Sequence, residues 1–431
     1  MSVERVASIL FCAGPFSGHI EPMLPIAAEL VRLGHKVHIL TGRAFESKVA
    51  STGATWVPLP TSVDFDVTNL DSAFPSRGSL NGARRAQFDL EHIFIRPIAE
   101  QSKAIDEITD RESIDVVVVE TMFFGAVPLL LRPSTSRPRV VALGSNPLSL
   151  PGYGRPPAGL GWPPARSWLG RFRNSAVNAA VRTLVLRSLQ HTAQDTVGSE
   201  LPVSILDWLT LVDDIVQLTV PGFEYPLPES YAAKVHFVGP VSVSDVDTQP
   251  LPSWWDDLDT RRPTFLVTQG SAERDLSQLI RPTIDALADR EVNVVVALGT
   301  DASGLEQPLP GNVFLADALP YDAVFPALSG FITNGGYGGV GFAIRHGVPV
   351  IAVGRSQDKA DVVARVQWSG IGIGIARQTV EPSRIQKAVE QLQRDGRFSS
   401  HAAELQRQAS SSSGMHGAVQ RILFGIGSVR V

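Results

Sequence analysis

The chain has 431 residues, too many for one ordinary hydrophobic core and enough for two domains of about 200 residues each. Its composition, 44% hydrophobic and 19% charged, is typical of a soluble globular protein. The net charge of -5 leaves no general basic surface for phosphate backbones, so nucleic acid is not an expected partner.

A single cysteine, Cys12, lies at the end of the apolar run Val6–Cys12. One cysteine supports neither a disulfide framework nor a thiolate metal cluster, so we expect a reduced, cytoplasmic setting without a signal peptide. The most membrane-like stretch, residues 115–131, contains Glu120 and falls short of the roughly 20 apolar residues of a membrane span. We therefore predict buried core there and no stable membrane insertion.

The first half of the chain alternates β-branched runs with apolar helical stretches. It begins with a strand, a loop at Ala13–Glu21 and a helix that starts at Pro22 and stops at Gly34. This alternation is typical of a parallel sheet covered on both faces, which binds ligands at the carboxyl ends of its strands. The expected strands are Val6–Cys12, Val37–Thr41, Ile114–Val119 and Arg139–Leu143.

Two further segments of the first half carry no strand pattern. Pro147–Pro164 is dense in proline and glycine, and the helical, arginine-rich stretch Ser167–Gln194 follows it. Either a surface excursion or a loop that shapes a binding pocket would have this composition.

Residues 241–263, VSVSDVDTQPLPSWWDDLDTRRP, are turn-rich and charged, which predicts an interdomain linker.

The second half repeats the alternation and ends in a helix-like stretch, Ser400–Phe424, which we expect to return to the first domain. The fold class is therefore predicted as α/β, with two doubly wound, Rossmann-like domains facing an interdomain cleft. The domains would be residues 1–240 and 264–400, joined by the linker 241–263 and followed by a C-terminal helix within 401–431. The strands expected in the second domain are Thr264–Thr268, Val292–Leu298, Asn312–Leu315, Phe331–Thr333, Val348–Val353 and Ile371–Ile375.

A glycine-rich loop, Asn334–Gly341, follows the expected strand Phe331–Thr333 and leads into a helical run. Glycines let the backbone approach an anion closely, and a helix N-terminus supplies N–H donors and a positive dipole end. A diphosphate would suit this loop, but the same glycines would also suit tight packing of helix against sheet. No Gly-Lys-Ser/Thr ending marks it as a P-loop, and Gly14–Gly18 does not complete the dinucleotide-binding GxGxxG pattern.

Several stretches together resemble a known family. Gly18–Met23 follows the first strand, Gly270-Ser271 follows the first strand of the second half, and Phe331–Arg365 contains the glycine loop, Gly347-Val348-Pro349 and Asp358-Lys359. Over nearly the whole chain, their order and spacing resemble a family 1, UDP-glycosyltransferase-like glycosyltransferase of the two-domain GT-B fold, of the microbial small-molecule type. The resemblance implies an inverting, metal-independent transfer of a hexose from a UDP- or dTDP-sugar to a hydroxyl group of a small, apolar acceptor.

The resemblance places the general base at His19, whose imidazole titrates near neutral pH. In the family a carboxylate orients this histidine, and the matching residue here is Glu120, where aspartate is usual. The extra methylene group changes the geometry of the pair. His19 would take the proton from the acceptor hydroxyl while the hydroxyl oxygen attacks the anomeric carbon opposite the nucleotide.

The resemblance also implies the residues that bind the donor. Leu319 and Tyr321 match the region that holds the nucleotide base, although Tyr321 would equally suit ordinary packing. Asp358 matches the residue that binds sugar hydroxyls and Lys359 stands where glutamine is typical, although a surface Asp–Lys pair would also explain both. The amide of Asn334 replaces a histidine found in many relatives. The residues implied to hold the diphosphate are Ser271, Thr333, Asn334, Gly335, Gly336, Gly338 and Gly339.

We expect no cofactor besides the sugar-nucleotide co-substrate, and no metal ion, because a helix N-terminus and backbone amides would replace a cation. The Asp-x-Asp triplets at 64–66, 245–247 and 257–259 lie in loop-like contexts away from the donor site.

The enzyme would be a monomer or a homodimer. One alternative is a GT-B-like epimerase or lipid-carrier transferase. Another is a catalytically degenerate glycosyltransferase that serves as a nucleotide-binding or activating partner protein.

Overall fold

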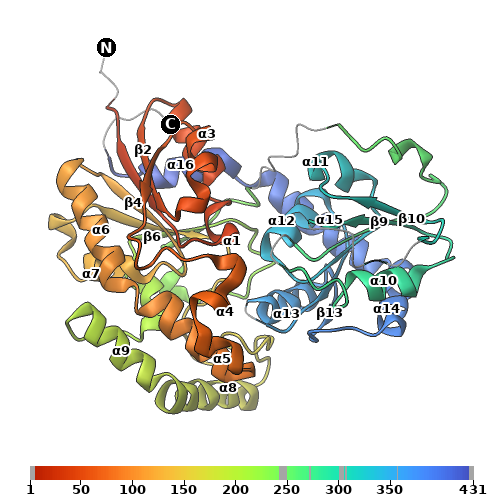
Figure 1. Cartoon of the computed structure of the whole chain (residues 1–431). Coiled ribbons are helices and arrows are strands. Elements are labelled where there is room, and N and C mark those ends of the chain that lie inside the picture. Colours follow the sequence, from red (N-terminus) through yellow and green to blue (C-terminus); the bar gives the residue numbers. More distant parts are fainter. Residues whose placement is uncertain are drawn as a thin grey trace.

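The computed structural model describes residues 5–241, 250–270, 273–299, 305, 308–356 and 358–426. Two parallel β-sheets, each lying between layers of helices, form the two halves of the molecule (Figure 1). The first sheet has the strand order β3-β2-β1-β4-β5-β6-β7, and the second has the order β10-β9-β8-β11-β12-β13. Both orders reverse beside their first strand, as in doubly wound folds that bind ligands at this point. The predicted pair of Rossmann-like domains is confirmed.

The strands are short, and the central ones of each sheet are buried. Those of the first sheet are β1 (Ser8–Cys12), β2 (Lys36–Thr41), β3 (Thr55–Pro58), β4 (Val116–Glu120), β5 (Arg139–Gly144), β6 (Asp214–Gln217) and β7 (Val235–Phe237). Those of the second sheet are β8 (Thr264–Thr268), β9 (Asn293–Ala297), β10 (Val313–Ala316), β11 (Gly330–Thr333), β12 (Val350–Val353) and β13 (Gly372–Ile375).

Helices cover the faces of both sheets. In the first half of the chain they are α1 (Ser17–Ile20), α2 (Leu24–Arg32), α3 (Glu46–Ser51), α4 (Leu70–Ala73), α5 (Gly82–Asp89), α6 (Ile98–Arg111), α7 (Val127–Leu130), α8 (Trp168–Ala180) and α9 (Arg187–Val197). In the second half they are α10 (Ile280–Leu287), α11 (Tyr321–Val324), α12 (Tyr337–His346), α13 (Lys359–Ser369), α14 (Pro382–Arg394), α15 (Arg397–Ser411) and α16 (Gly414–Leu423).

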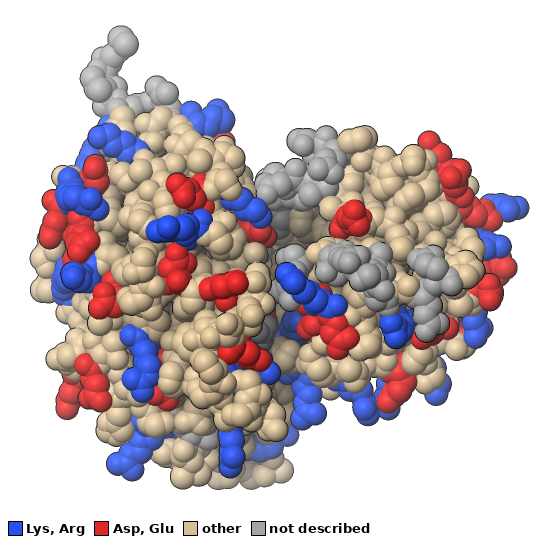
Figure 2. Space-filling model, in the orientation of Figure 1, with Lys and Arg blue, Asp and Glu red and all other residues tan. Residues whose placement is uncertain are grey.

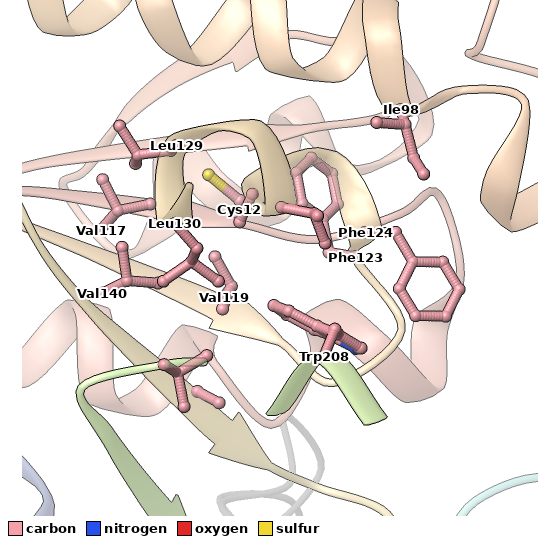
Figure 3. Packing of buried hydrophobic residues seen from close by; sticks show 14 of the residues in the cluster. Cys12, Ile98, Val117, Val119, Phe123, Phe124, Leu129, Leu130, Val140 and Trp208 are labelled. Carbon is pink, nitrogen blue, oxygen red and sulfur yellow. The ribbon is translucent and has the colours of Figure 1, made fainter. Parts of the chain in front are cut away.

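Successive residues of the central strands belong to two different buried clusters, one on each face of the first sheet. In β4, Val117 and Val119 join one cluster, whereas Val116 and Val118 join the other. Figure 3 shows Val117 and Val119 packed in the cluster that includes Trp208. The prediction of buried core around this strand is confirmed. Among the residues that the structure describes, no helix is long and apolar enough to cross a membrane.

The predicted strands agree with the observed ones to within two residues at each end. The structure adds β3, β6 and β7, which were not predicted because they are short and carry little apolar pattern of their own. The predicted loop at Ala13–Glu21 is wrong in part, because it contains α1. The carbonyl of Phe16 accepts from the amides of His19 and Ile20 at 3.0 and 3.1 Å, and these bonds close the helical turn.

The C-terminal helices contact both halves of the molecule. α15 packs against α12 of the second domain, and α16 packs against α2, β4 and β6 of the first (Figure 1). Ala418 and Ile422 of α16 are fully buried in a first-domain core cluster. Arg139 of β5 donates to the carbonyls of Arg421 and Ile422 at 2.8 and 3.0 Å. The end of the chain therefore ties the second half to the first, while the exact domain boundaries stay a prediction.

Candidate active site

His19 and Glu120 meet at the carboxyl edge of the first sheet. His19 lies on α1, soon after β1, and Glu120 is the last residue of β4, which pairs with β1. His19 Nδ1 lies 3.0 Å from Glu120 Oε2, and only 18% and 1% of the two side-chain surfaces are exposed. The longer glutamate side chain therefore reaches the histidine. The approach is poorly aligned, because Nδ1 has no hydrogen-bond partner of good geometry among the described residues.

Three donors fix the carboxylate of Glu120. Its Oε1 accepts from the Thr121 hydroxyl at 2.8 Å and from Asn146 Nδ2 at 3.0 Å. Its Oε2 accepts from the Met122 amide at 2.8 Å. Hydrogen bonds of this kind favour the ionised form of a buried carboxyl group. Glu120 is therefore held as an anion beside the histidine.

Each residue of the His19–Glu120 pair changes the pKa of the other. Burial disfavours the charged form of His19, but the charge and contact of Glu120, with a smaller contribution from Asp358, outweigh it, so the pKa of His19 is raised. Burial likewise opposes ionisation of Glu120, but the charge of His19 and the bonds from Met122 and Thr121 prevail, so the pKa of Glu120 is lowered. The carboxylate thus makes the imidazole a stronger base.

An aromatic wall made of Phe16, Phe65 and Phe94 adjoins His19. The ring centroids of Phe16 and Phe94 lie 5.1 and 6.0 Å from that of the imidazole, and Phe94 is almost parallel to it, at 16°. Phe65 continues the wall from Phe16, at a centroid distance of 6.1 Å. The base therefore borders a flat apolar surface, which the sequence did not indicate.

The second domain faces this base. Figure 2 shows a hollow between the two domains, with side chains of both charges on the surrounding surface. Asp358, directly before α13, is close enough for its charge to raise the pKa of His19. The start of α13 and the imidazole of His19 therefore share one site, although 339 residues separate Asp358 from His19 in the chain.

The glycine loop joins the end of β11 to the start of α12. Thr333 is the buried last residue of β11, Gly335 has a φ of +81°, and Gly336 is the N-cap residue of α12. No side chain caps this helix, so the N–H groups of its first turn have no side-chain acceptor at the N-cap. A Cβ atom at Gly338 would meet nothing within 4 Å, whereas one at Gly339 would lie 3.4 Å from the Phe331 ring. Gly339 thus also serves helix packing.

Asn334 binds the backbone of its own domain. Its Nδ2 donates to the carbonyl of Gln269, directly after β8. Asn334, Gln269 and Lys359 line a very small cavity of about 10 Å³ between the glycine loop and α13. Asn334 therefore ties the glycine loop to the β8 loop, a role that the sequence did not indicate. Ser271, the predicted partner on that loop, lies outside the described residues.

The two residues predicted to hold the nucleotide base pack within the second domain. Leu319 is buried in its core. Tyr321 begins α11, and its ring centroid lies 5.3 Å from that of Phe325 and 5.1 Å from that of Phe342. These contacts match the packing interpretation of Tyr321. A base contact by either residue stays a prediction.

Asp358 and Lys359 are not an ordinary surface pair. Burial raises the pKa of Asp358, although the charges of Lys359 and His19 oppose this. Burial lowers the pKa of Lys359, against the opposing charges of Glu273 and Asp358. Both residues lie at the start of α13, where Lys359 adjoins Gly335 of the glycine loop. The structure therefore brings the predicted sugar-binding pair to the same cleft as His19.

Among the described residues, no group of three histidine, cysteine, aspartate or glutamate side chains is arranged to hold a metal ion. Asp64 accepts from the Arg43 amide, Asp66 caps a short helical turn, and Asp259 pairs with Arg261. The triplet at residues 245–247 lies outside the described part of the chain.

Comparisons with known proteins identify the family of the chain. Residues 281–423 match the family described as erythromycin biosynthesis protein CIII-like, C-terminal domain. The chain is 35% identical to 4'-demethylrebeccamycin synthase of Lentzea aerocolonigenes, over 96% of this chain and 99% of that protein. It is 31% identical to UDP-glucosyltransferase A1 of Starmerella bombicola, over 94% of this chain and 90% of that protein.

Solved structures show the same fold. A calicheamicin glycosyltransferase superposes with a TM-score of 0.73 at 23% identity, covering 98% of this chain and all of that one. A spinosyn rhamnosyltransferase in complex with thymidine diphosphate superposes with a TM-score of 0.64 at 15% identity, over 96% and 99% of the two chains.

The two facing Rossmann-like domains are thus those of a GT-B glycosyltransferase. The chain belongs to the family 1, UDP-glycosyltransferase-like enzymes of the natural-product type. Nothing in these comparisons supports the alternative of a catalytically degenerate partner protein.

Proposed function

We propose that this glycosyltransferase moves a hexose from a UDP- or dTDP-sugar to a hydroxyl group of a small, apolar acceptor. We also propose that it inverts the anomeric carbon and needs no metal ion. The observation that carries the proposal is the position of His19, which Glu120 contacts from one side while the aromatic wall and Asp358 adjoin it. A base between an apolar surface and a donor loop suits direct attack by a hydroxyl group.

In this reaction His19 acts through Nε2, because Nδ1 faces Glu120. Nε2 takes the proton of the acceptor hydroxyl as its oxygen bonds to the anomeric carbon. The bond from that carbon to the diphosphate oxygen breaks on the opposite face, and its electron pair leaves with the nucleotide. Attack opposite the leaving group inverts the configuration.

The departing diphosphate would be stabilised by the glycine loop. The amides of Gly335, Gly336 and Gly338 and the uncapped start of α12 supply donors at the place where negative charge develops. Thr333, Asn334, Gly339 and Ser271 complete this proposed subsite. We propose metal independence because these donors would take the place of a cation. A divalent ion or other cofactor is therefore not required.

The remaining donor contacts are proposed from their position. Asp358 and Lys359 would bind sugar hydroxyls, since both lie at the start of α13, where Lys359 adjoins the glycine loop and the charge of Asp358 acts on His19. Leu319 and Tyr321 would lie near the base. One relative is named as a UDP-glucosyltransferase and one solved structure holds thymidine diphosphate, so both nucleotides are candidates for this enzyme.

The aromatic wall supports an apolar acceptor. Phe16, Phe65 and Phe94 cluster beside the base, and such an aromatic cluster favours contact with apolar molecules. We propose that the enzyme works in the cytoplasm as a monomer or homodimer. The buried thiol of Cys12 suits a reducing compartment.

Turnover tests the proposal. The full chain is incubated with UDP- and dTDP-sugars and with phenolic and terpenoid alcohols, in a chelator such as EDTA, and products are identified by mass. We expect a glycoside with one nucleotide, and proton NMR should show the anomeric configuration opposite to that of the donor. Retained configuration, or transfer only after a divalent metal is restored, would contradict the proposed mechanism.

A further inference from the structure

A buried polar network crosses the interface between the two domains. Glu224, Arg365, Tyr337 and Gln217 are each less than a tenth exposed. Glu224 and Gln217 belong to the first domain, whereas Tyr337 and Arg365 belong to the second. Buried polar groups are costly to desolvate, so a closed set of bonds at this place calls for an explanation beyond packing.

Glu224 contacts both donor-side helices at once. Its Oε1 accepts from the Tyr337 hydroxyl at 2.8 Å, and its Oε2 accepts from Arg365 Nε at 2.7 Å. Tyr337 is the first residue of α12, directly after the glycine loop, and Arg365 lies on α13, which starts at Lys359. Figure 1 shows both helices on the side of the second domain that faces the first. One first-domain carboxylate thus holds the two helices that carry the proposed donor site.

The same network continues to the catalytic pair. Gln217 Nε2 donates to the Tyr337 hydroxyl at 2.7 Å and to the carbonyl of Asn146 at 2.9 Å. The side chain of Asn146 in turn donates to Glu120 Oε1 at 3.0 Å. A chain of short contacts therefore runs from the start of α12 to the carboxylate beside His19.

The backbone leaves room for this network. Gln217 ends β6 opposite Gly144 in β5, and a Cβ atom at Gly144 would lie 1.8 Å from Gln217 Oε1. Arg365 also donates to the carbonyl of Leu148 at 2.9 Å, which anchors α13 to the loop after β5. Burial and the charge of Glu224 raise the pKa of Tyr337 well above 10.0, so its hydroxyl remains a donor.

We propose that three residues, Glu224, Tyr337 and Arg365, form an interdomain clamp. The clamp holds the glycine loop at a fixed position relative to the His19–Glu120 pair. They are positioning residues, because they act through the loop and the base and touch neither substrate in the proposed mechanism. The inference rests on the proposed function and adds a requirement to it. Transfer depends on a fixed distance between two sites on different domains, and a displacement of about 1 Å can slow a reaction about a hundredfold.

The test compares Tyr337→Phe and Glu224→Gln with the unmodified full chain. Tyr337→Phe keeps the ring, which packs 6.0 Å from that of Phe223, and removes only the hydroxyl. Three quantities are measured: the Kd for UDP and dTDP, the transfer kcat, and the share of donor that is hydrolysed. In hydrolysis, water supplies the oxygen that bonds to the anomeric carbon, and the same bond to diphosphate breaks. If the glycine loop and the base lose their fixed relative position, water should therefore compete better with the acceptor.

We expect nucleotide Kd values within about twofold of the unmodified enzyme, a transfer kcat lower by about 10- to 100-fold, and a larger hydrolysed share. If Tyr337→Phe leaves both the transfer kcat and the hydrolysed share of the donor unchanged, the clamp proposal is wrong. A parallel loss of kcat and nucleotide affinity would also overturn it, because the residues would then serve the donor site alone. If Glu224→Gln fails to fold, Tyr337→Phe decides the question.

Two matched controls separate the clamp from general effects. Tyr231→Phe removes a hydroxyl from a partly buried tyrosine of the first domain, outside the network. Gln408→Leu removes another interdomain bond, in which the Gly222 amide donates to Gln408 Oε1 at 2.9 Å. Both should leave the hydrolysed share unchanged. If the unmodified chain transfers no sugar, the proposed function is wrong. If the unmodified chain and the variants Tyr337→Phe and Glu224→Gln all transfer sugar normally, only the clamp proposal is wrong.

A double-mutant cycle tests whether the network acts as one unit. Asn146→Ala removes the bond to Glu120, and Tyr337→Phe removes the hydroxyl on the other side of the interface. Gln217 links the two residues through the Asn146 backbone carbonyl. We expect the double variant to transfer at nearly the rate of the slower single variant. If the rate reduction in the double variant equals the product of the two single reductions, the two residues do not act as one unit.

Discussion

Nδ1 of His19 lies 3.0 Å from Oε2 of Glu120, although the family usually places the shorter aspartate at this position. The negative charge of Glu120 raises the pKa of His19 against the effect of burial. Since a base works only when neutral, activity should fall as the pH drops through this raised pKa, above the ordinary value of 6.5.

Glu120→Gln should therefore move the acid limb of the kcat/KM profile to lower pH. Without the carboxylate charge, burial becomes the main influence on His19, and the pKa of its imidazole falls. The plateau rate should drop about 100-fold or more, because the neutral imidazole is then a weaker base. A pH profile from 5 to 9 measures both effects. An acid limb at the same pH in both enzymes would show that Glu120 does not tune His19.

Gly335→Ala should weaken nucleotide binding. Gly335 has a φ of +81°, a backbone conformation that costs an alanine roughly 1–2 kcal/mol, and the displaced loop would lose its amide contacts with diphosphate. We expect the Kd for UDP or dTDP to rise about tenfold, which corresponds to roughly 1.4 kcal/mol. Titration calorimetry measures it. Gly198→Ala is the control, because Gly198 has a φ of +74° and an added Cβ would meet nothing within 4 Å. Equal Kd values in the two variants would contradict a role for the loop in binding.

Phe94→Leu should raise the KM for a phenolic acceptor and leave the KM for the donor unchanged. Leucine preserves apolar volume but removes the ring that lies parallel to His19. Loss of one aromatic contact is worth about 0.5–1.5 kcal/mol, or roughly a 2- to 10-fold change in KM. Phe398→Leu in the second domain is the control. A donor KM that rises with the acceptor KM would indicate a disturbed cleft and not an acceptor wall.

Arg365→Met should destabilise the fold strongly. Arg365 and Glu224 are 3% and 1% exposed, so loss of one partner leaves an unpaired buried charge, at a cost of about 3–5 kcal/mol. Urea unfolding followed by circular dichroism measures the change. The double variant Glu224→Met/Arg365→Met should recover much of the loss, since no charge is then left unpaired. A double variant less stable than either single one would contradict this explanation.

The sequence predicted both sheets and most of the donor loop because these features are local. Strands such as Thr264–Thr268 carry their own apolar pattern, and His19, Gly335 and Asp358 come soon after strands. Gly339 supports the packing interpretation of the glycine loop, since its Cβ position faces Phe331, whereas diphosphate binding by the loop stays a prediction. The expected loop at His19 became a helical turn because the Phe16 carbonyl accepts two amides, which residue type alone does not indicate.

The residues that the sequence missed owe their importance to distant partners. Asn146 lies 26 residues from Glu120, and Tyr337 lies 113 residues from Glu224. Asn146 belongs to no motif that pattern reading would single out, and Tyr337 lies within the glycine loop, where the sequence shows no sign of a partner in the other domain. Gln217 ends β6, a strand that the sequence did not predict, so its position gave no signal either. Only the packing of the two domains makes these residues a network.

His19→Ala tests the central claim most directly. With UDP- or dTDP-sugar and an acceptor at saturation, the transfer kcat should fall by about 10²- to 10⁴-fold, because the acceptor hydroxyl loses its base. The Kd for the nucleotide should stay within about twofold of the unmodified value, since the glycine loop is untouched. His401→Ala, on the exposed surface of α15, should transfer at the normal rate. A His19→Ala enzyme that transfers sugar as fast as the unmodified chain would contradict the account.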